Sequence, residues 1–384
     1  MRILHIGYRL PPEPGGLERH IQRLVREQLL RGHEVVVAHR RGEAPSGARS
    51  LPLVPTRAGR AVARRSDVLA FGLECAHALR RAAEPAEPAE PAELAELAEL
   101  DVVHLHGDHR EALALGTAAR RLGAPLVLTV HGAITTRHLP IMPFAFRHVD
   151  DFIAIGARPA QDLRRAGIPA GRIATMCSGL DLGHIARHRG RPVEPGLVVS
   201  VGSLEKVKNH ALTIEAFHAL RATHPGARLV IAGEGGERAE LERLAGTGRG
   251  VHLAGHLPES EVYALVGRAQ AFVLSSRRLP TIGEGIPTSA LEALALGTPV
   301  LLSSETSLEP IVEPGAYRTF RSGSVPELAA RLRAVLDGDP SLPETVERGL
   351  RATSALDWPA MAARVEERYA ALLPGGPRRR AATP

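Results

Sequence analysis

Two glutamates, eight positions apart, stand where a phosphorylated and hydroxyl-rich ligand could be held. Glu284 lies in a Gly/Pro-rich loop, and Glu292 follows inside an apolar stretch that is typical of a helix. A helix N-terminus attracts anions because its first amides are unpaired and its dipole is positive there. Carboxylates accept hydrogen bonds from hydroxyl groups. Together these features favour a ligand of the sugar-nucleotide type.

The spacing also has a structural interpretation. Ser289 and Glu292 form the Ser-x-x-Glu pattern of a capping box, in which both side chains bond to backbone amides. A capping box would explain Glu292 without a ligand. It would not explain Glu284, because glycines beside a loop carboxylate serve the close approach of a backbone. The sequence leaves both interpretations of Glu292 open.

Three further segments place small or basic residues after a predicted strand. Gly202 and Ser203 would let a phosphate approach backbone amides, and Lys208 could neutralise it. Gly16, the second of two glycines after the first strand, could serve the same purpose or make an ordinary tight turn. His131 ends another strand, where ligands bind in open α/β sheets, although a lone histidine is more often structural.

Two other polar groups are interpreted as structural. His104, His106 and His109 are close in sequence, and alternation puts the first two on one strand face. No acidic or cysteine partner converges on them in sequence, so a metal site is not expected. Asp150 and Asp151 are interpreted as the turn that starts a strand. We therefore predict no metal and no cofactor.

Composition narrows the class of protein. The chain has 384 residues, which favours two domains, and 44% hydrophobic residues, which allows large cores. Aromatic residues make up only 3%, which argues against a nucleic-acid partner that would need stacking platforms. The net charge of +6 is interpreted as a solvated basic surface, with attraction to an anionic substrate or a membrane surface as alternatives.

Cysteine usage and hydropathy bear on the compartment. Cys75 and Cys177 form neither a disulfide framework nor a metal-type spacing. The N-terminus does not have the pattern of a signal peptide, and no apolar run is long enough to cross a bilayer. We expect a cytoplasmic protein. A peripheral contact with the inner face of the plasma membrane, through the basic helix that contains Arg19 and Arg23, is the alternative.

Strands and helices are predicted to alternate along two series. The first contains a strand over 3–7, a helix over 17–29 and a strand over 34–38, which together make a βαβ unit. Alternation with Val/Ile/Leu-rich strands indicates doubly wound parallel sheets. The other predicted strands cover 101–106, 126–130, 152–155, 197–201, 228–232, 251–254, 271–274 and 299–302.

The predicted organisation has two large domains. Residues 1–188 are predicted to form an N-terminal Rossmann-like domain, with a solvated low-complexity insertion over 83–100. Residues 189–355 are predicted to form a second, C-terminal α/β domain. A helix over 356–373 is expected to cross back and pack on the N-terminal domain, before a disordered tail over 374–384.

These pieces resemble a family over nearly the whole chain. The chain is similar to the GT-B glycosyltransferases of the large retaining family 4, also described as glycosyl transferases group 1. The most specific motif is the family's Glu-x7-Glu, here Glu284 and Glu292, in the Glu-Gly-Ile-Pro variant of the loop. The resemblance implies an α/β fold of two facing Rossmann-like domains with an interdomain cleft. It also implies that residues 1–188 are the acceptor domain and residues 189–355 the nucleotide-sugar donor domain.

The resemblance also implies roles for individual residues. Glu292 should accept hydrogen bonds from the ribose of the donor, and Glu284 should hold the hexose hydroxyls with the amides of Gly285 and Ile286. Lys208 should stabilise the diphosphate as it leaves, beside the turn of Gly202 and Ser203. From the N-terminal domain, Gly16 should bring its amide to the phosphate, and His131 should face the reacting carbon.

One position departs from the family pattern. The family usually has an arginine that helps to bind the diphosphate where this chain has Ser203. Either this cation is missing, or Lys206, Arg277 or Arg278 replaces it. The charge distribution of the donor site is therefore left open.

The predicted function is a retaining, metal-independent hexosyl transfer. A UDP- or GDP-sugar would donate to the hydroxyl of a small or lipid-linked acceptor, in bacterial glycan, glycolipid or natural-product biosynthesis. Two alternatives stay open at this point: a sugar-nucleotide 2-epimerase, and a degenerate protein that binds a sugar nucleotide without turnover. The sequence does not choose the donor, the acceptor or the oligomeric state.

Overall fold

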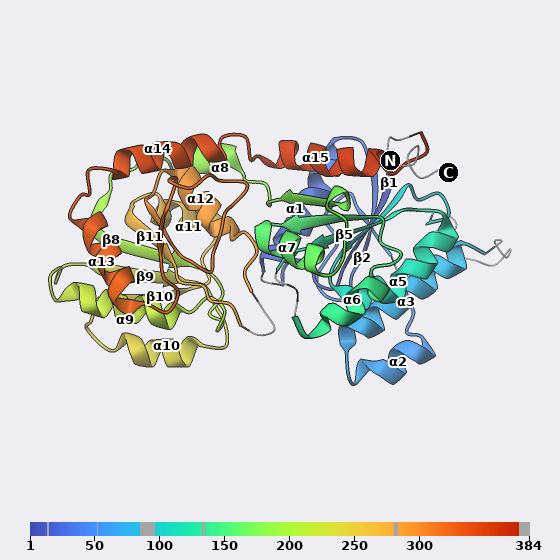
Figure 1. Ribbon diagram of the computed structural model, residues 1–384, viewed down its shortest axis with the longest axis horizontal. Helices are drawn as coiled ribbons and strands as arrows, with labels where there is room; N and C mark the ends of the chain where they lie inside the picture. The colour runs from blue at the N-terminus through green and yellow to red at the C-terminus, as the bar shows by residue number, and fades with distance from the viewer. Residues whose placement is uncertain are drawn as a thin grey trace. The chain divides into compact units, whose positions relative to one another are not determined.

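The chain folds into two compact α/β units, described here from a computed structural model (Figure 1). The structure describes residues 1–13, 15–51, 53–84, 97–132, 134, 136–279 and 283–375. Unit 1 comprises Met1–Ile155, Pro159–Gly179 and the segment from Trp358 onward, and unit 2 comprises Gly156–Arg158 and Leu180–Asp357. The fold class predicted from the sequence, two Rossmann-like α/β units, is confirmed.

The division between the units falls at a different residue from the predicted 188/189 boundary. Unit 2 already begins at Leu180, because the short helix α8 (Leu182–Ala186) packs against α12 (Thr288–Leu296) of the same unit. Residues 156–158 also join unit 2, where Arg158 pairs with Glu305 at 2.9 Å between Nη1 and Oε2.

Unit 1 is built on a seven-stranded sheet of order β3-β2-β1-β4-β5-β6-β7, in which every described pairing is parallel. Its strands are largely buried runs of Val, Ile, Leu and Ala, as expected when helices cover both faces of a sheet. The strands are β1 (Arg2–Gly7), β2 (Glu34–Ala38), β3 (Arg49–Ser50), β4 (Val102–His106), β5 (Leu126–Val130), β6 (Asp151–Ile155) and β7 (Ile173–Met176).

Three helices of this part of the chain, α2 (Arg57–Ala63), α3 (Asp67–Ala82) and α5 (His109–Leu122), begin at a residue whose side chain caps them. For example, α5 starts with a capping box of Asp108 and Glu111 and ends at Gly123 in the left-handed conformation. The other helices are α1 (Gly16–Leu30), α6 (Met142–Ala145) and α7 (Ala157–Arg165), with 3₁₀ turns η1 (Thr136–Ile141) and η2 (Ala170–Arg172).

The C-terminal helix α15 (Trp358–Ala370) packs against α1 in unit 1, which confirms the predicted return of the chain. Arg368 makes a two-pronged ion pair with the buried Asp151, at 2.6 and 2.7 Å. This pair gives Asp151 a structural role, in line with the interpretation from the sequence. Tyr369 of the same helix is fully buried.

Unit 2 contains a six-stranded sheet of order β10-β9-β8-β11-β12-β13, also parallel in every described pairing. The three-residue edge strand β13 was not predicted. The strands are β8 (Glu194–Val201), β9 (Arg228–Ala232), β10 (Val251–Gly255), β11 (Ala269–Leu274), β12 (Val300–Ser303) and β13 (Arg318–Phe320). The remaining helices are α9 (His210–Arg221), α10 (Arg238–Ala245), α11 (Glu259–Val266), α13 (Val325–Leu336) and α14 (Leu342–Thr353).

Parallel pairing puts the carboxyl ends of all strands of a sheet at one edge. In unit 1 the residues after β5 therefore gather at that edge, and in unit 2 the residues after β8 and β11 do so. None of the helices in the described ranges is long and apolar enough to cross a membrane. Residues 85–96 of the predicted insertion and 376–384 of the predicted tail lie outside the described residues.

Candidate active site

Three polar side chains meet at the carboxyl edge of the sheet in unit 2. Lys208 Nζ lies 2.6 Å from Glu284 Oε1, and Ser276 Oγ donates to Glu284 Oε2 at 2.6 Å. The Lys208 and Glu284 side chains are 15% and 14% exposed, so the ion pair is mostly shielded from water. The structure thus brings together the two residues that the sequence singled out for the leaving phosphate and the sugar.

Gly202, the first residue after β8, lies beside the Lys208 side chain. A β-carbon on Gly202 would lie 3.4 Å from Cδ and Cε of Lys208. A β-carbon on Gly233 would lie 1.9 Å from the carbonyl oxygen of Gly202, and Gly233 has a positive φ of 149°. Glycine is therefore required at 233 for the two βα turns to approach each other.

The backbone around Lys208 is held by neighbouring loops. The amide of Lys208 donates to the carbonyl of Glu205 at 2.9 Å. Asn209 then adopts the left-handed conformation, with φ of 53°, and α9 begins at the next residue. Ser275, which directly follows β11, donates to the Asn209 carbonyl at 2.7 Å. These bonds fix the stem of Lys208 beside the end of β11.

Glu292 is mostly buried inside α12, at 9% exposure, and Tyr263 Oη donates to its Oε1 at 3.0 Å. The capping-box interpretation is wrong. Helix α12 begins at Thr288, its N-cap is Pro287, and no side chain caps it. Ser289 lies within the first turn and donates to the carbonyl of Val201 at 3.1 Å.

The loop before α12 packs in part through Ile286. This side chain is 6% exposed, and its Cγ1 would lie 2.9 Å from a β-carbon on Gly156. Gly285 is partly exposed next to it. The roles predicted for the amides of Gly285 and Ile286 stay predictions.

Ser203, at the position where the family arginine is expected, is exposed. Lys206, one of the proposed substitutes, is exposed as well. Nε of Arg277 donates to the carbonyl of Lys206 at 3.0 Å, so these two candidates are neighbours. The replacement of the family arginine by Lys206, Arg277 or Arg278 stays a prediction.

In unit 1, His131 follows β5 and belongs to a group of buried or partly buried histidines, which we call the histidine cluster: His5, His20, His104, His106 and His131. His131 Nε2 lies 3.4 Å from His106 Nδ1, and its ring centroid lies 4.8 Å from that of His20. Burial lowers the pKa of His131 to about 3, so the ring is neutral at pH 7.

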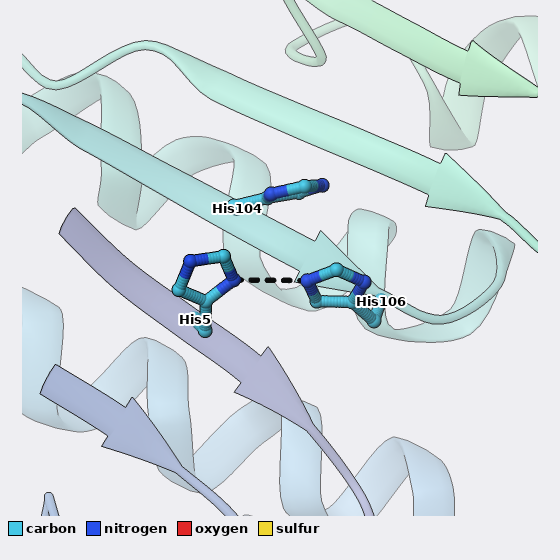
Figure 2. A group of neighbouring side chains, drawn as sticks. All are labelled: His5, His104 and His106. Carbon is cyan, nitrogen blue, oxygen red and sulfur yellow. Dashed lines mark hydrogen bonds between the residues drawn. The ribbon is translucent and has the colours of Figure 1, made fainter. Parts of the chain in front are cut away.

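Strand pairing assembles the histidine cluster. His5 on β1 pairs in register with His104 on β4, and His106 lies two residues further on the same face, as Figure 2 shows. His5 Nδ1 and His106 Nε2 are 2.9 Å apart. Burial lowers the pKa of His5 to about 4, and burial with neighbouring histidines lowers those of His104 and His106 well below the usual value.

The geometry of the histidine cluster bears on the prediction that the protein binds no metal. One nitrogen each from His5, His104 and His106 lie within 4.8 Å of one another, and neutral imidazoles are common metal ligands. The same nitrogens are engaged in hydrogen bonds within the protein. His109 does not join them, because its ring lies against His138 at 4.6 Å between centroids. A metal-free site stays a prediction.

Gly16 is the first residue of α1, as its proposed role at a helix N-terminus requires. A β-carbon there would have no heavy atom within 4 Å, so packing does not demand a glycine at this position. By contrast, a β-carbon on Gly15 would lie 1.9 Å from the carboxylate of Glu18. Packing within the protein therefore does not explain the glycine at position 16, and this is consistent with the close approach of a ligand there.

Sequence reasoning missed the partners of the predicted residues. Ser276 follows β11, so the rule that ligands bind at the carboxyl ends of strands could have found it. Tyr263 on α11 carried no signal, and neither did Gln28, which contacts His5. Such contacts depend on strand and helix order, which the local pattern does not contain.

Two known families match the chain, and their matches meet close to the boundary between units 1 and 2. Residues 14–184 match the family described as Glycosyltransferase Family 4, and residues 184–351 match the one described as Glycosyl transferases group 1. A glycogen synthase of Mycobacterium tuberculosis is 31% identical over 403 residues, covering 97% of this chain and 95% of that protein. A GDP-mannose-dependent alpha-(1-6)-phosphatidylinositol dimannoside mannosyltransferase of the same species is 25% identical, covering 81% and 82%.

Solved structures share the fold at lower identity. Anabaena HepE in complex with UDP and glucose superposes with a TM-score of 0.70 and 15% identity, covering 96% of this chain and 98% of that one. Sucrose-phosphate synthase from Thermosynechococcus elongatus gives a TM-score of 0.72 and 18% identity, covering 97% and 98%.

Proposed function

Because this chain belongs to glycosyltransferase family 4 and is a glycosyltransferase, we propose that it transfers a hexose-type sugar from a UDP- or GDP-sugar to a hydroxyl acceptor, with retention at the anomeric carbon. The observation that carries the proposal is the contact of Lys208 with Glu284 at the carboxyl edge of the second sheet. The Lys208 cation can bind a diphosphate, and the adjacent Glu284 carboxylate can bind sugar hydroxyls. This arrangement suits a ligand in which a diphosphate is bonded directly to a sugar.

Lys208 supplies positive charge where negative charge develops. In the reaction the bond between the anomeric carbon and the diphosphate oxygen breaks, and the bond to the acceptor oxygen forms. A fixed cation stabilises the leaving diphosphate more than it stabilises the bound donor, and this difference lowers the barrier. We propose that Lys208 and the backbone amides after Gly202 make a metal ion unnecessary.

Glu284 and Glu292 recognise hydroxyl groups. Lys208 and Ser276 each engage one oxygen of Glu284, which orients the carboxylate, and each oxygen retains acceptor capacity for a sugar hydroxyl. Tyr263 orients Glu292 in the same way, and we assign this carboxylate to the donor ribose. From unit 1 we assign the amide of Gly16 to the phosphate and His131 to the reacting sugar.

Retention follows if the acceptor attacks from the face that the diphosphate leaves. The acceptor hydroxyl then gives its proton to the leaving phosphate oxygen, so no separate base is required. Neutral His131 can accept a hydrogen bond from a sugar hydroxyl without adding charge near the reacting carbon.

The names of relatives support both donor nucleotides and two acceptor classes. HepE is described with UDP and glucose, and the mannosyltransferase is described as GDP-mannose-dependent and acting on a phosphatidylinositol dimannoside. Glycogen synthase supports a glucan acceptor. The two relatives from Mycobacterium tuberculosis are named as a synthase and a transferase, so they favour transfer over 2-epimerisation.

A thermal-shift panel of UDP, GDP, ADP and dTDP, each with its sugars, tests the donor. A ligand at 100 times its Kd stabilises the native state by about 2.7 kcal/mol, so one nucleotide should raise the Tm clearly above the others. Glu292→Ala should reduce the shift at the same ligand concentration. The proposal is refuted if no nucleotide raises the Tm of the wild-type protein.

Release of nucleoside diphosphate then separates the three candidate activities. A transferase releases it in step with glycosylation of an added acceptor, either a soluble glucan or a phosphatidylinositol-type lipid in mixed micelles. A 2-epimerase converts the donor without any acceptor. A degenerate binding protein retains the Tm shift but shows no turnover with either acceptor.

A further inference from the structure

Hydrogen bonds in the histidine cluster have a direction that is fixed at one end by Gln28. His5 Nε2 lies 2.7 Å from the side-chain oxygen of Gln28, and both residues are fully buried. A carbonyl oxygen has no hydrogen to donate. His5 Nε2 must therefore carry the hydrogen of this bond.

The direction then propagates from ring to ring, because a neutral imidazole has one N–H and one lone pair. His5 Nδ1 is left with a lone pair, so His106 Nε2 donates to it across 2.9 Å (Figure 2). His106 Nδ1 is left with a lone pair in turn, and His131 Nε2 donates to it across 3.4 Å. Burial lowers the pKa of each of these three rings, which keeps them neutral at pH 7.

We propose that Gln28 and His5 are positioning residues which, through His106, hold His131 in the tautomer with hydrogen on Nε2 and the lone pair on Nδ1. His131 Nδ1 can then accept a hydrogen bond but cannot donate one. The use of this lone pair rests on the proposed function, in which His131 Nδ1 accepts from a hydroxyl of the donor sugar.

A second chain of hydrogen bonds leaves the same Gln28 amide and does not reach His131. The Gln28 nitrogen donates to Tyr369 Oη at 3.5 Å, and Tyr369 Oη lies 2.5 Å from His104 Nδ1. His104 Nε2 continues to Thr129 Oγ1 at 2.6 Å. This branch provides a matched control, because its removal leaves the path from Gln28 to His131 intact.

The tautomer can be read directly by NMR. In protein labelled with ¹⁵N-histidine, two-bond ¹H–¹⁵N correlations report which nitrogen of each ring carries hydrogen, and His131→Gln identifies the His131 signals by their loss. The wild-type spectrum should show His131 with hydrogen on Nε2. Finding the hydrogen on Nδ1 overturns the proposal, whatever the variants do.

Gln28→Met keeps the length of the side chain and removes the acceptor oxygen. His5 is then free to reverse, and a substantial share of His131 should appear with hydrogen on Nδ1. The loss of one hydrogen bond to the sugar should lower kcat by about tenfold. Tyr369→Phe should keep His131 in the Nε2–H form and kcat within about twofold of wild type. An unchanged His131 tautomer in folded Gln28→Met refutes the positioning role.

The same spectra separate this proposal from the proposed function. If the wild-type His131 carries hydrogen on Nε2 and Gln28→Met shifts it, the hydrogen-bond path is established even where no donor is turned over. If transfer is observed but the tautomer does not respond to Gln28→Met, the function holds and the path fails.

Discussion

Replacing Lys208 by alanine removes the only side-chain cation that the structure places in contact with Glu284 among the described residues. The variant deprives the leaving diphosphate of a fixed charge and leaves the Glu284 carboxylate, among the residues that the structure describes, with Ser276 as its side-chain donor. Catalysis and stability should both fall, but by different amounts. The ratio between the two effects tests the assignment of Lys208 to the reaction.

The structure sets the size of each effect. Lys208 Nζ and Glu284 Oε1 are 2.6 Å apart, and the two side chains are about 15% exposed. The ion pair is therefore intermediate between a surface pair and a fully buried one. A charge-assisted hydrogen bond of this kind contributes about 1.5–3 kcal/mol to folding. At about 2–4 °C per kcal/mol, the Tm should fall by roughly 3–12 °C. Loss of one preorganised donor to developing negative charge lowers kcat by about 10²–10³.

The assay is steady-state release of nucleoside diphosphate at saturating donor and acceptor, run well below the Tm of each variant. Arg243→Ala is the matched control, because Arg243 is also ion-paired to a glutamate of unit 2 but is 69% exposed. It should leave kcat and Tm nearly unchanged. A folded Lys208→Ala protein whose kcat stays within about threefold of wild type would refute the reasoning.

Three further outcomes are expected. Glu292→Gln should weaken nucleoside-diphosphate binding about tenfold by calorimetry, since an acceptor for the ribose becomes partly a donor; equal Kd values would remove Glu292 from the ribose site. Ser203→Arg should tighten the same Kd about three- to tenfold, because a guanidinium binds phosphate with two hydrogen bonds; no change would mean that another cation already serves the diphosphate. Burial lowers the pKa of His131 from 6.5 to about 3 in the folded protein, so the unfolded chain takes up a proton at a higher pH than the folded one. The stabilising effect of the buried neutral ring is therefore complete above pH 6.5. Below that, the free energy of unfolding falls by about 1.4 kcal/mol per pH unit until about pH 3. The Tm should therefore fall from pH 7 to pH 5, with a shallower fall in His131→Asn, and an equal slope in the two proteins would contradict the assignment.

The sequence predicted the fold because local patterns sufficed for it. Buried Val/Ile/Leu runs alternate with amphipathic helices, and only parallel sheets with helices on both faces satisfy that order. The edge strand β13 escaped prediction because three residues carry too short a pattern. The capping box at Ser289 and Glu292 failed for a local reason as well, since the helix starts at Thr288 and Ser289 lies too far inside it to cap.

In the candidate site, too, the sequence predicted some features and only the structure showed others. Residue types and spacing were enough to single out Glu284, Lys208 and His131 one at a time. Their surroundings depend on contacts between distant segments: Glu284 with Lys208, 76 positions apart, and His5 with His106, 101 positions apart. Strand order and register decide which side chains share an edge or a face, and these are set by packing over the whole sheet. The sequence by itself therefore determined which chemistry was available, and the tertiary structure decided which residues orient it, because orientation comes from neighbours that local sequence does not specify.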